Sequence, residues 1–403
     1  MTDSSAAQRV FSPAERVAIL PPNFWSEMDA AIARLAAQPG PRVIDVSKGN
    51  PDTPTPEHIV AAMQAQVAEP RNHRYPSYEA RPSLRQAVAE RYRVDHGVTV
   101  DPETEVAVFH GSHEAILASV QALADPGSTV VLPDPGYPLY RSAASLAQAH
   151  VAPLVLRHPE YAPDWSSISE VKDARMLLLN YPNNPTGALA TTRIFSEALD
   201  FAAATGAAFI HDFAYSSLGF NGQTPLSALA VDTQLRATVE LQTLSKTYSM
   251  AGWRCGMAAG NASIIDAMKA FQRHAYSTMF GALQETAAVA LSANQDAAHE
   301  LVTVYQRRRD QVVAALRQLG WDVVQPEGTF FVWARVPYGG DAIDFANRLR
   351  EEQRVAVAPG DGFGSQGRGH IRIGLVHDEE TLAEMLQRLA DFTGPSVASG
   401  AVV

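Results

Sequence analysis

Cysteine is almost absent from this sequence, since Cys255 is the only one among 403 residues. A single thiol cannot form an internal disulfide, which excludes the class of disulfide-stapled secreted domains and favours a reducing, cytoplasmic location. Basic residues are outnumbered as well, with 32 lysines and arginines against 43 acidic residues and a formal net charge of -11. Because nucleic-acid backbones are bound by basic faces, we expect no nucleic-acid partner.

Long apolar stretches are also missing. No run approaches the roughly 18 apolar residues that a membrane-spanning helix needs, so we expect no association with a membrane. The first residues, MTDSSAAQRVF, contain no apolar segment like that of a signal peptide, and we expect no leader. Hydrophobic residues still make up 46% of the chain, which is enough for a large buried core. The length predicts about two or three domains.

Short apolar runs alternate with amphipathic helical patterns through the first two thirds of the chain. Helical patterns such as residues 113–123 and 193–204 separate the runs, and another helix is predicted over residues 23–37. Buried apolar strands separated by helices favour a mainly parallel sheet covered on both faces. The predicted strands are residues 105–111, 128–134, 174–182, 207–215, 238–245 and 254–260.

The order of elements changes near residue 300. A long charged helical pattern spans residues 297–319, and strand, helix, strands and helix follow over residues 330–392. This change predicts a second, smaller α/β domain. We expect residues 1–48 to form an N-terminal arm and part of the small domain, residues 49–298 the large domain, and residues 299–403 the C-terminal small domain.

Two familiar patterns carry little weight. The run Gly362–Gly367 has the G-x-G-x-x-G spacing of dinucleotide sites, but a strand follows it where the phosphate-facing helix should begin. His110 and His113 lie close in the sequence, but no acidic or cysteine ligand nearby completes a metal set. We expect neither a Rossmann site nor a metal site.

The ends of the predicted strands carry the informative motifs, because parallel α/β sheets bind ligands at the carboxyl ends of their strands. Gly111-Ser112-His113 opens a helix whose free N–H groups can bind an anion, although taken alone an ordinary Ser112 N-cap explains it better. The turn from Asn180 to Gly187 holds two prolines, and it either aims an asparagine amide into a site or simply joins a strand to a helix.

Two further strand ends carry charged residues. Asp212 ends a buried strand, and a buried carboxylate needs a cationic or hydrogen-bonding partner. That partner is either a protonated ring nitrogen of a ligand or a basic side chain in a structural salt bridge. Lys246 follows Thr243-Leu244-Ser245 at the end of another strand. A lone lysine is normally a solvated charge, but one screened from water can lose its proton and become a nucleophile. Arg254 follows closely and offers a forked donor suited to phosphate.

Together these motifs resemble the fold type I aminotransferases of classes I and II, which depend on pyridoxal 5′-phosphate (PLP). The similarity runs from about Leu20 to the last predicted helix, and the motifs occur in the family's order: GNPD, Y…LR, GS.E, PGYP, NPTG, D..Y, TLSK…GWR and HIRIG. The resemblance implies an α/β fold with a large PLP-binding domain, built on a mostly parallel seven-stranded sheet between helices, and a smaller α/β domain.

The resemblance also implies a role for each matching residue. Lys246 would carry the cofactor and move the substrate's α-proton, while Asp212 would pair with the ring nitrogen. Asn184 and Tyr215 would bind the phenolic oxygen, and Tyr137 would stack on the ring. The residues implied for the phosphate are Gly111, Ser112, His113, Thr243, Ser245 and Arg254.

The substrate carboxylate and a second subunit complete the implied site. Arg372 would pair with the α-carboxylate of the substrate, and Gly49 would make a close backbone contact near it. Tyr75 matches the tyrosine that reaches the phosphate of the neighbouring subunit, which implies a homodimer with shared active sites. Most relatives have glycine at the position of Ala80, so the loop around it is expected to differ locally.

The same resemblance narrows the reaction. We expect a ping-pong transfer of an amino group between a small-molecule L-amino acid and a 2-oxo acid. Relatives specific for LL-diaminopimelate place glutamate where Tyr78 stands, so an aromatic residue there favours neutral apolar or thioether substrates such as methionine, with glutamate or glutamine as partner. Glu79 and Lys48 stay open as further substrate contacts. Alternatives are an LL-diaminopimelate or alanine aminotransferase, or a cysteine-S-conjugate β-lyase.

Overall fold

The computed structural model describes residues 11–21 and 23–394. Most of the N-terminal stretch, where no leader was expected, lies outside these ranges, as does the end of the chain beyond residue 394. The largest element is an eight-stranded sheet in the order β2-β9-β8-β7-β6-β3-β4-β5. Its strands are β2 (Val106–Phe109), β3 (Thr129–Asp134), β4 (His150–Arg157), β5 (Ala162–Asp164), β6 (Met176–Asn180), β7 (Ala208–Asp212), β8 (Thr238–Thr243) and β9 (Gly256–Gly260).

All six predicted strands are present in this sheet, which is mostly parallel. The pairs β4·β3, β3·β6, β6·β7 and β7·β8 are parallel, whereas β9 is antiparallel to β8 and β2, and β5 to β4. The expected count of seven strands was one short, because the short β5 extends the edge of the sheet. We also did not predict β4, which contains Pro153. The outer side of β4 pairs with β5 only over residues 155–157, so the missing N–H of Pro153 breaks no ladder bond there.

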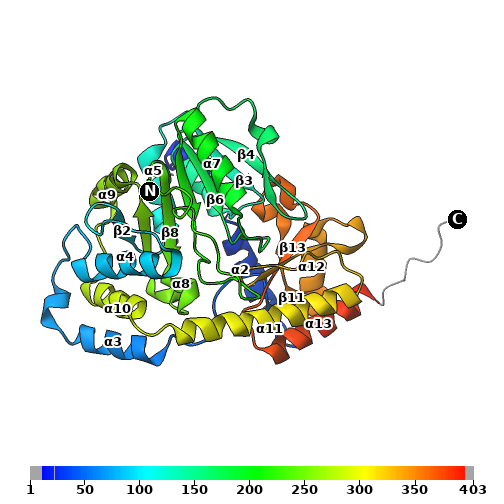
Figure 1. The fold of residues 1–403 in the computed structure, drawn as a ribbon. Helices are drawn as coiled ribbons and strands as arrows, with labels where there is room; N and C mark the ends of the chain where they lie inside the picture. The colour runs from blue at the N-terminus through cyan, green and yellow to red at the C-terminus, as the bar shows by residue number, and fades with distance from the viewer. Residues whose placement is uncertain (1–10, 22, 395–403) are drawn as a thin grey trace, which may run out of the picture.

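Helices cover both faces of the sheet, which explains why its strands are apolar at successive positions. In β6, Leu178 packs with α5 (Ser112–Leu123), α6 (Leu139–Leu146) and α9 (Ala262–Ala275) on one face. Leu177 and Leu179 pack with α7 (Thr192–Thr205) on the other. A third group, α3 (Glu57–Val67), α4 (Pro82–His96) and α10 (Gly281–Ser292), lies beside β2 and β9 (Figure 1).

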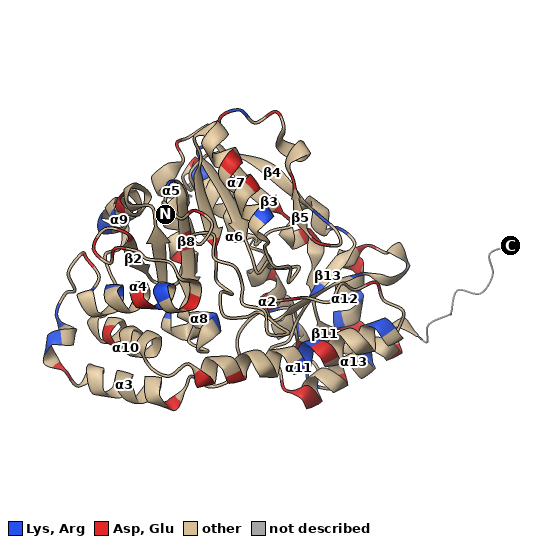
Figure 2. Cartoon of the chain, in the orientation of Figure 1, with Lys and Arg blue, Asp and Glu red and all other residues tan. Residues whose placement is uncertain are grey.

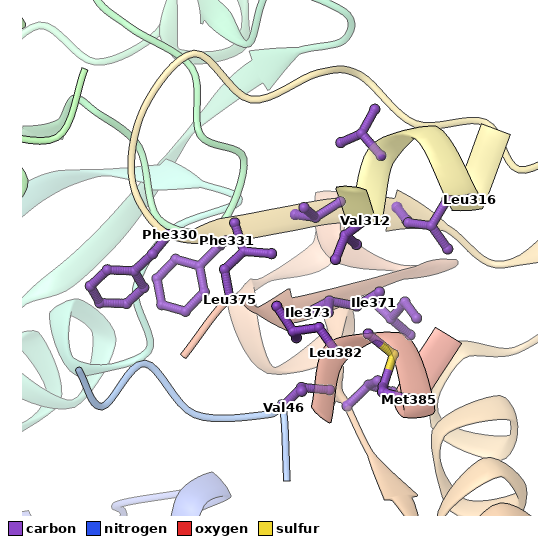
Figure 3. Close-up of a cluster of buried hydrophobic side chains, with 14 of the residues drawn as sticks. Val46, Val312, Leu316, Phe330, Phe331, Ile371, Ile373, Leu375, Leu382 and Met385 are labelled. Carbon is purple, nitrogen blue, oxygen red and sulfur yellow. The ribbon is translucent and has the colours of Figure 1, made fainter. Parts of the chain in front are cut away.

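The C-terminal third forms a smaller antiparallel sheet with helices against it. The sheet is β10 (Phe331–Arg335), β13 (His370–Gly374) and β12 (Ala358–Pro359), and the helices are α11 (Asp296–Gln318), α12 (Ala342–Gln353) and α13 (Glu379–Thr393). Its core includes Phe330, Ile371 and Met385 (Figure 3). The N-terminal β1 (Ile44–Asp45) pairs with β11 (Val355–Ala356), which attaches the start of the chain to this region.

Helix α11 runs beneath both regions (Figure 1). Ala298 at its start packs in the core of the large region, whereas Leu301 packs in the core of the small one. The boundary that the sequence predicted near residue 299 falls inside this helix and stays a prediction. The remaining elements are α1 (Glu15–Ala18), α2 (Phe24–Ala36), α8 (Leu244–Thr247) and the short 3-10 turns Pro70–His73, Trp165–Ile168, Ala251–Trp253, Pro337–Gly339, Gly360–Phe363 and Ser365–Gly367.

Charged residues of both signs are present on the outer helices α4, α11 and α13 in the view of Figure 2. One of them holds a motif in place. Arg308 on α11 binds Asp52 through two hydrogen bonds of 2.8 Å and donates to the carbonyl of Leu375 at 3.0 Å, which fixes the GNPD loop against the small sheet. Among the helices in the described ranges, none is long and apolar enough to span a membrane.

Candidate active site

A cavity of about 420 Å³ opens at the carboxyl ends of β6, β7 and β8, beside the start of α5. Its wall brings together most of the residues that the sequence predicted, although they are spread over more than 300 positions of the chain. The predicted residues that line it are Gly49, Ser112, His113, Tyr137, Asn184, Asp212, Tyr215, Thr243, Ser245, Lys246, Arg254 and Arg372.

Lys246 lies in α8, directly after the end of β8. Its Nζ donates a hydrogen bond to the carbonyl of Gly49 at 2.8 Å and lies 5.2 Å from the centre of the Phe330 ring. Burial, together with the positive charges of Arg372 and Arg254, lowers the pKa of Lys246 from 10.5 to about 8. With this pKa roughly one tenth of the amine is neutral at pH 7, and the fraction grows with pH, which makes the amine available as a nucleophile.

Asp212 ends β7 as a buried carboxylate. The hydroxyl of Tyr140 donates to its Oδ2 at 2.6 Å, and the N–H of Ala214 donates to Oδ1 at 3.3 Å. Burial raises the pKa of Asp212, while the hydrogen bond from Tyr140 opposes that rise. Within the described residues no lysine or arginine forms an ion pair with Asp212, so the alternative of a structural salt bridge gains no support. The carboxylate is suited to receive a cation from a ligand.

A second buried acid lies on the neighbouring strand. His211 Nε2 donates to the carbonyl of Tyr181 at 2.8 Å, and His211 Nδ1 lies 2.8 Å from Glu240 Oε1, with both side chains fully buried. Glu240 also accepts hydrogen bonds from the Ser227 hydroxyl, at 2.9 Å, and from the N–H of Ala228. This pair ties β7 to β8 and to the turn that follows β6.

An anion site forms where α5 begins. The helix starts at Ser112 with Gly111 as its N-cap, and no side chain caps it. The alternative of an ordinary Ser112 N-cap is therefore wrong, and the N–H groups stay available. Gly111 has a φ of 85°, and a Cβ there would lie 2.7 Å from Arg254 Nη2. Glycine therefore lets the guanidinium approach the helix end. Thr243 Oγ1 lies 2.9 Å from Ser245 Oγ, which adds two hydroxyls to the site.

The turn after β6 is held by its own asparagines. Asn180 Oδ1 accepts from the N–H of Asn184 at 2.8 Å, and Asn183 Oδ1 accepts from the hydroxyl of Thr186 at 2.7 Å. The next helix, α7, is capped by Thr191 rather than by Asn184 or Thr186. This arrangement leaves the Asn184 amide directed at the cavity, where its oxygen accepts from Arg372 Nη1 at 2.8 Å.

Arg372, in the middle of β13, is only 2% exposed. Besides Asn184, it donates from Nη2 to the carbonyl of Ser47 at 2.6 Å, and its guanidinium lies 3.9 Å from the centre of the Phe331 ring. Burial lowers the pKa of Arg372 to about 10, and no carboxylate among the described residues pairs with it. A buried cation of this kind is a site for a ligand carboxylate.

Gly49 packs against Phe331 in the part of the cavity that Arg372 lines, and only glycine fits there. A Cβ at Gly49 would collide with the ring of Phe331. The carbonyl groups of Ser47 and Gly49 bind Arg372 and Lys246 respectively, so one short segment lies between the two cations. Lys48, between them in sequence, also lines the cavity and forms ion pairs with Asp29 and, at 3.7 Å, with Asp45.

Gly111 stands behind the cavity wall as the N-cap of α5, and three further candidate residues do not reach the cavity of their own chain. Tyr75 is fully exposed and Tyr78 is 60% exposed, and neither lines the cavity. Glu79 forms ion pairs with Lys269 at 3.1 Å and with Arg273 at 3.2 Å, which turn it away from the cavity. The expectation that Tyr78 contacts substrate therefore fails within a single chain and depends on a second subunit.

Sequence reasoning missed Tyr140, Asn180 and, on α2, Trp25, which lies 5.0 Å from the Arg372 guanidinium. Tyr140 had only a weak signal, because it follows Tyr137 by three residues but Tyr137 lies before α6 begins. Trp25 had none beyond the helical spacing of its neighbours.

The two discounted patterns have local explanations. The glycine run at residues 362–367 forms two 3-10 turns whose Ser365 and Gln366 N–H groups bind the carboxylate of Asp134, at 3.1 and 3.0 Å. The run therefore holds an internal carboxylate. His110 pairs with Glu114 at 2.8 Å, and the described residues contain no cluster of three potential metal ligands.

Comparison with known proteins agrees with this geometry. The model of the family "Aminotransferase class I and II" matches residues 41–389. The chain is 45% identical, over 92% of its length and 94% of the relative's, to L-glutamine--4-(methylsulfanyl)-2-oxobutanoate aminotransferase of Bacillus subtilis. It is 40% identical to LL-diaminopimelate aminotransferase of Dehalococcoides mccartyi, over 94% of this chain and 98% of that one.

Solved structures give the same result. The apo structure of BacF from Bacillus subtilis superposes with a TM-score of 0.92 at 36% identity, covering 96% of this chain and 99% of that one. The family match spans nearly all of the described residues, and the folds agree over the same extent. The chain therefore belongs to the class I and II aminotransferases, enzymes that use PLP to transfer amino groups between amino acids and 2-oxo acids.

Proposed function

We propose that this enzyme transfers an amino group between an L-amino acid with a neutral apolar or thioether side chain, such as methionine, and a 2-oxo acid. Glutamate or glutamine would be the other amino acid of the ping-pong cycle. One observation carries the reaction: Arg372 and Lys246 donate to the carbonyls of Ser47 and Gly49, two residues apart. A substrate whose carboxylate is held by Arg372 therefore has its α-carbon beside the Lys246 amine.

The cavity fits PLP at both of its ends. At one end, Gly111 and the start of α5 form a cradle that a Cβ would fill, and Arg254 and the hydroxyls of Thr243 and Ser245 face it. At the other end, the buried Asp212 carboxylate accepts hydrogen bonds from the Tyr140 hydroxyl and the Ala214 N–H, both neutral, and has no cationic partner among the residues that the structure describes. A dianionic phosphate suits the first end, and a protonated ring nitrogen suits the second.

Each residue would hold one part of the cofactor. Ser112, His113, Thr243, Ser245 and Arg254 would bind the phosphate, and Tyr137 would lie against the ring. Tyr215 and the Asn184 amide nitrogen would donate to the phenolic oxygen, while the Asn184 oxygen stays on Arg372. When bound, PLP supplies an electron sink for the carbanion at the substrate's α-carbon.

The chain's own groups do the remaining work. Lys246 Nζ would remove the α-proton and hold it, because its lowered pKa leaves the amine able to accept a proton near neutral pH. Arg372 would orient the substrate through its carboxylate. Trp25 and Phe331, whose rings flank the guanidinium, would exclude water from that ion pair and offer an apolar surface to the substrate side chain.

A homodimer is part of the proposal. Tyr75 and Tyr78 are exposed in the single chain, and Phe280 and Val289 on or beside α10 also expose apolar surface. Burial of this surface against a second copy would allow Tyr75 to reach the phosphate of the neighbouring cavity and Tyr78 its substrate. The scarcity of cysteine supports a cytoplasmic location for the dimer.

LL-diaminopimelate is the second candidate substrate. It is favoured by the relatives of that name. It is also favoured by Lys48 and Asp29, which place one positive and one negative charge on the cavity wall. A distal amino-acid group carries the same two charges. Glu79, the carboxylate nearest in sequence to the position that holds the distal ammonium in those relatives, is paired with Lys269 and Arg273 in its own chain. This weighs against diaminopimelate.

A half-reaction screen tests the proposal. The holoenzyme is mixed with single amino acids, and the visible absorbance band of the bound cofactor is followed; methionine and either glutamate or glutamine should bleach it. Lys246→Ala is the control and should bleach with none of them. Bleaching by LL-diaminopimelate and by no other amino acid would show that diaminopimelate, rather than methionine, is the substrate. Pyruvate and thiol release from cystathionine, without amination of any 2-oxo acid, would replace transamination with β-elimination.

A further inference from the structure

Lys48 is a cavity residue that neither the cofactor nor the α-carboxylate uses. The backbone on each side of it is occupied, since Ser47 and Gly49 give their carbonyls to Arg372 and Lys246. Lys48 itself lines the cavity, and its ammonium pairs with Asp29, which lines the cavity too. Its ammonium is therefore close to the place where a substrate bound by Arg372 would extend its side chain.

Lys48 forms an ion pair with Asp29 in which a substrate carboxylate can replace the aspartate. Asp29 on α2 and Asp45 on β1 face its ammonium, and Arg372 is the next cation along the wall. Lys48 is 39% exposed and Asp29 is 54% exposed, so water reaches the pair. A partly solvated ion pair contributes little to stability, and replacing one carboxylate with another costs little.

Helix α2 puts an apolar surface beside this ion pair. Trp25 and Asp29 are four residues apart and therefore lie on the same face of the helix, and both line the cavity. Trp25 covers Arg372, at 5.0 Å from its guanidinium. A substrate side chain that leaves Arg372 would meet the indole and the Lys48–Asp29 pair together.

A ping-pong aminotransferase binds both of its substrates in one site. If one substrate is neutral and the other carries a distal carboxylate, the site must neutralise that charge only when it is present, because an unpaired charge in either case is costly. An exchangeable lysine–aspartate pair meets this requirement. With a neutral side chain bound, the lysine keeps its own carboxylate.

We propose that Lys48 is a specificity-determining residue that binds the distal carboxylate of a five-carbon dicarboxylate substrate, glutamate or 2-oxoglutarate, by exchanging Asp29 for it. This inference rests on the proposed function, which supplies the neutral first substrate. When a thioether side chain is bound, it lies against Trp25 and Lys48 remains paired with Asp29. When glutamate is bound, the substrate carboxylate takes the place of Asp29.

Glutarate is the probe, because it has the two carboxylates of glutamate and no amino group to react. Its dissociation constant is measured from the change that it causes in the absorbance of the holoenzyme. Lys48→Met should weaken glutarate by about tenfold or more, as expected for loss of one charge-assisted contact, and Lys48→Arg should restore most of the affinity. Asp29→Asn removes the nearer of the two carboxylates that compete for the lysine and leaves only Asp45 at 3.7 Å. It should tighten glutarate several-fold, the opposite sign from Lys48→Met.

The half-reactions provide a second readout. Lys48→Met should raise the KM for glutamate with little change in kcat, and its effect on the KM for methionine should be much smaller. Equal glutarate affinity in wild type and Lys48→Met, or weaker binding by Asp29→Asn, overturns the assignment of Lys48. A wild-type enzyme that binds glutarate through Lys48 but reacts with neither methionine nor glutamate overturns the proposed function alone.

Discussion

Arg372 donates from Nη1 to the side-chain oxygen of Asn184 across 2.8 Å, although 188 positions separate them in the sequence. The contact joins the small sheet to the turn after β6, and so joins the proposed substrate anchor to a proposed cofactor contact. The family pattern alone treats these residues as serving different ligands. In the folded chain they form one hydrogen-bonded unit, and a change to either should alter the position of the other.

The arginine's geometry gives the first prediction. Arg372→Lys keeps the positive charge but loses the fork that holds Asn184, Ser47 and a carboxylate together. We expect kcat/KM for methionine to fall by about 100-fold, roughly 3 kcal/mol of transition-state binding, as measured in single-turnover assays. Binding of an amine analogue without the carboxylate is the control and should change little; an equal loss there would contradict this role.

Tyr140 gives a prediction for cofactor binding. Its hydroxyl opposes the rise in the pKa of Asp212 that burial causes, so Tyr140→Phe should raise that pKa further. Because Asp212 must be ionised to pair with a ring cation, the variant should lose PLP affinity as the pH falls, beginning at a higher pH than wild type. PLP titration of the apoenzyme across pH measures this. A loss of affinity that does not vary with pH would point to packing instead.

Lys246 gives a prediction in the alkaline range. Its pKa of about 8 means that the apoenzyme's reaction with an amine-directed label should rise with pH and level off above about 8. Arg372→Met should move the midpoint up, because the guanidinium lowers this pKa, and Asp212→Asn should move it down. At Lys246 the folded chain binds fewer protons than the unfolded chain between pH 8 and 10.5, so this group's contribution to stability grows with pH across that window. Lys246→Met should flatten the dependence of the urea midpoint on pH there.

The exposure of Tyr75 predicts complementation between subunits. Tyr75→Ala and Lys246→Ala homodimers should both have low activity, the first because it loses a phosphate contact and the second because it loses the reactive amine. A mixed dimer contains one cavity with both residues intact. Co-expression in equal amounts should recover about one quarter of wild-type sites, as random pairing in a two-fold dimer dictates. Recovery no greater than the sum of the homodimers would rule out a shared site.

The buried His211–Glu240 pair predicts a loss of stability. Glu240→Leu leaves His211 without its carboxylate and should lower the free energy of unfolding by about 3–5 kcal/mol. Glu240→Gln should cost less, because its amide can donate to a neutral imidazole while Nε2 keeps the Tyr181 carbonyl. Urea unfolding of these variants and of the His211→Leu/Glu240→Leu double variant measures the coupling. Additive losses would show that the two side chains act separately.

The positions of residues at the strand ends could be predicted from the sequence. Asp212, Lys246 and the start of α5 follow apolar runs, and the parallel arrangement of those runs brings their ends together without further information. Tyr140 and Trp25 were missed because they lie inside helices, where spacing tells which residues share a face but not what that face meets. The strand β4 was missed for a local reason, since Pro153 is tolerated only because its outer neighbour is short.

Other features needed partners far away in the sequence or in another molecule. The ion pair of Lys48 with Asp29 depends on how α2 lies across the cavity, which no local pattern encodes. The place of Tyr75 and Tyr78 depends on a second copy of the chain. The Gly362–Gly367 run shows the opposite case, in which a recognisable spacing serves only to bind Asp134 within the chain.

Helix α11 passes from one core to the other between Ala298 and Leu301 and then continues for most of its 23 residues beneath the small sheet. A helix of that length is roughly 35 Å long. A rotation about its first turn, taken as the pivot, would therefore move its far end the most. A tilt of about five degrees at the pivot displaces the far end by about 3 Å, by the same geometry. A change of packing around Ala298 would therefore displace the small sheet, and with it Arg372, by more than it displaces the start of the helix.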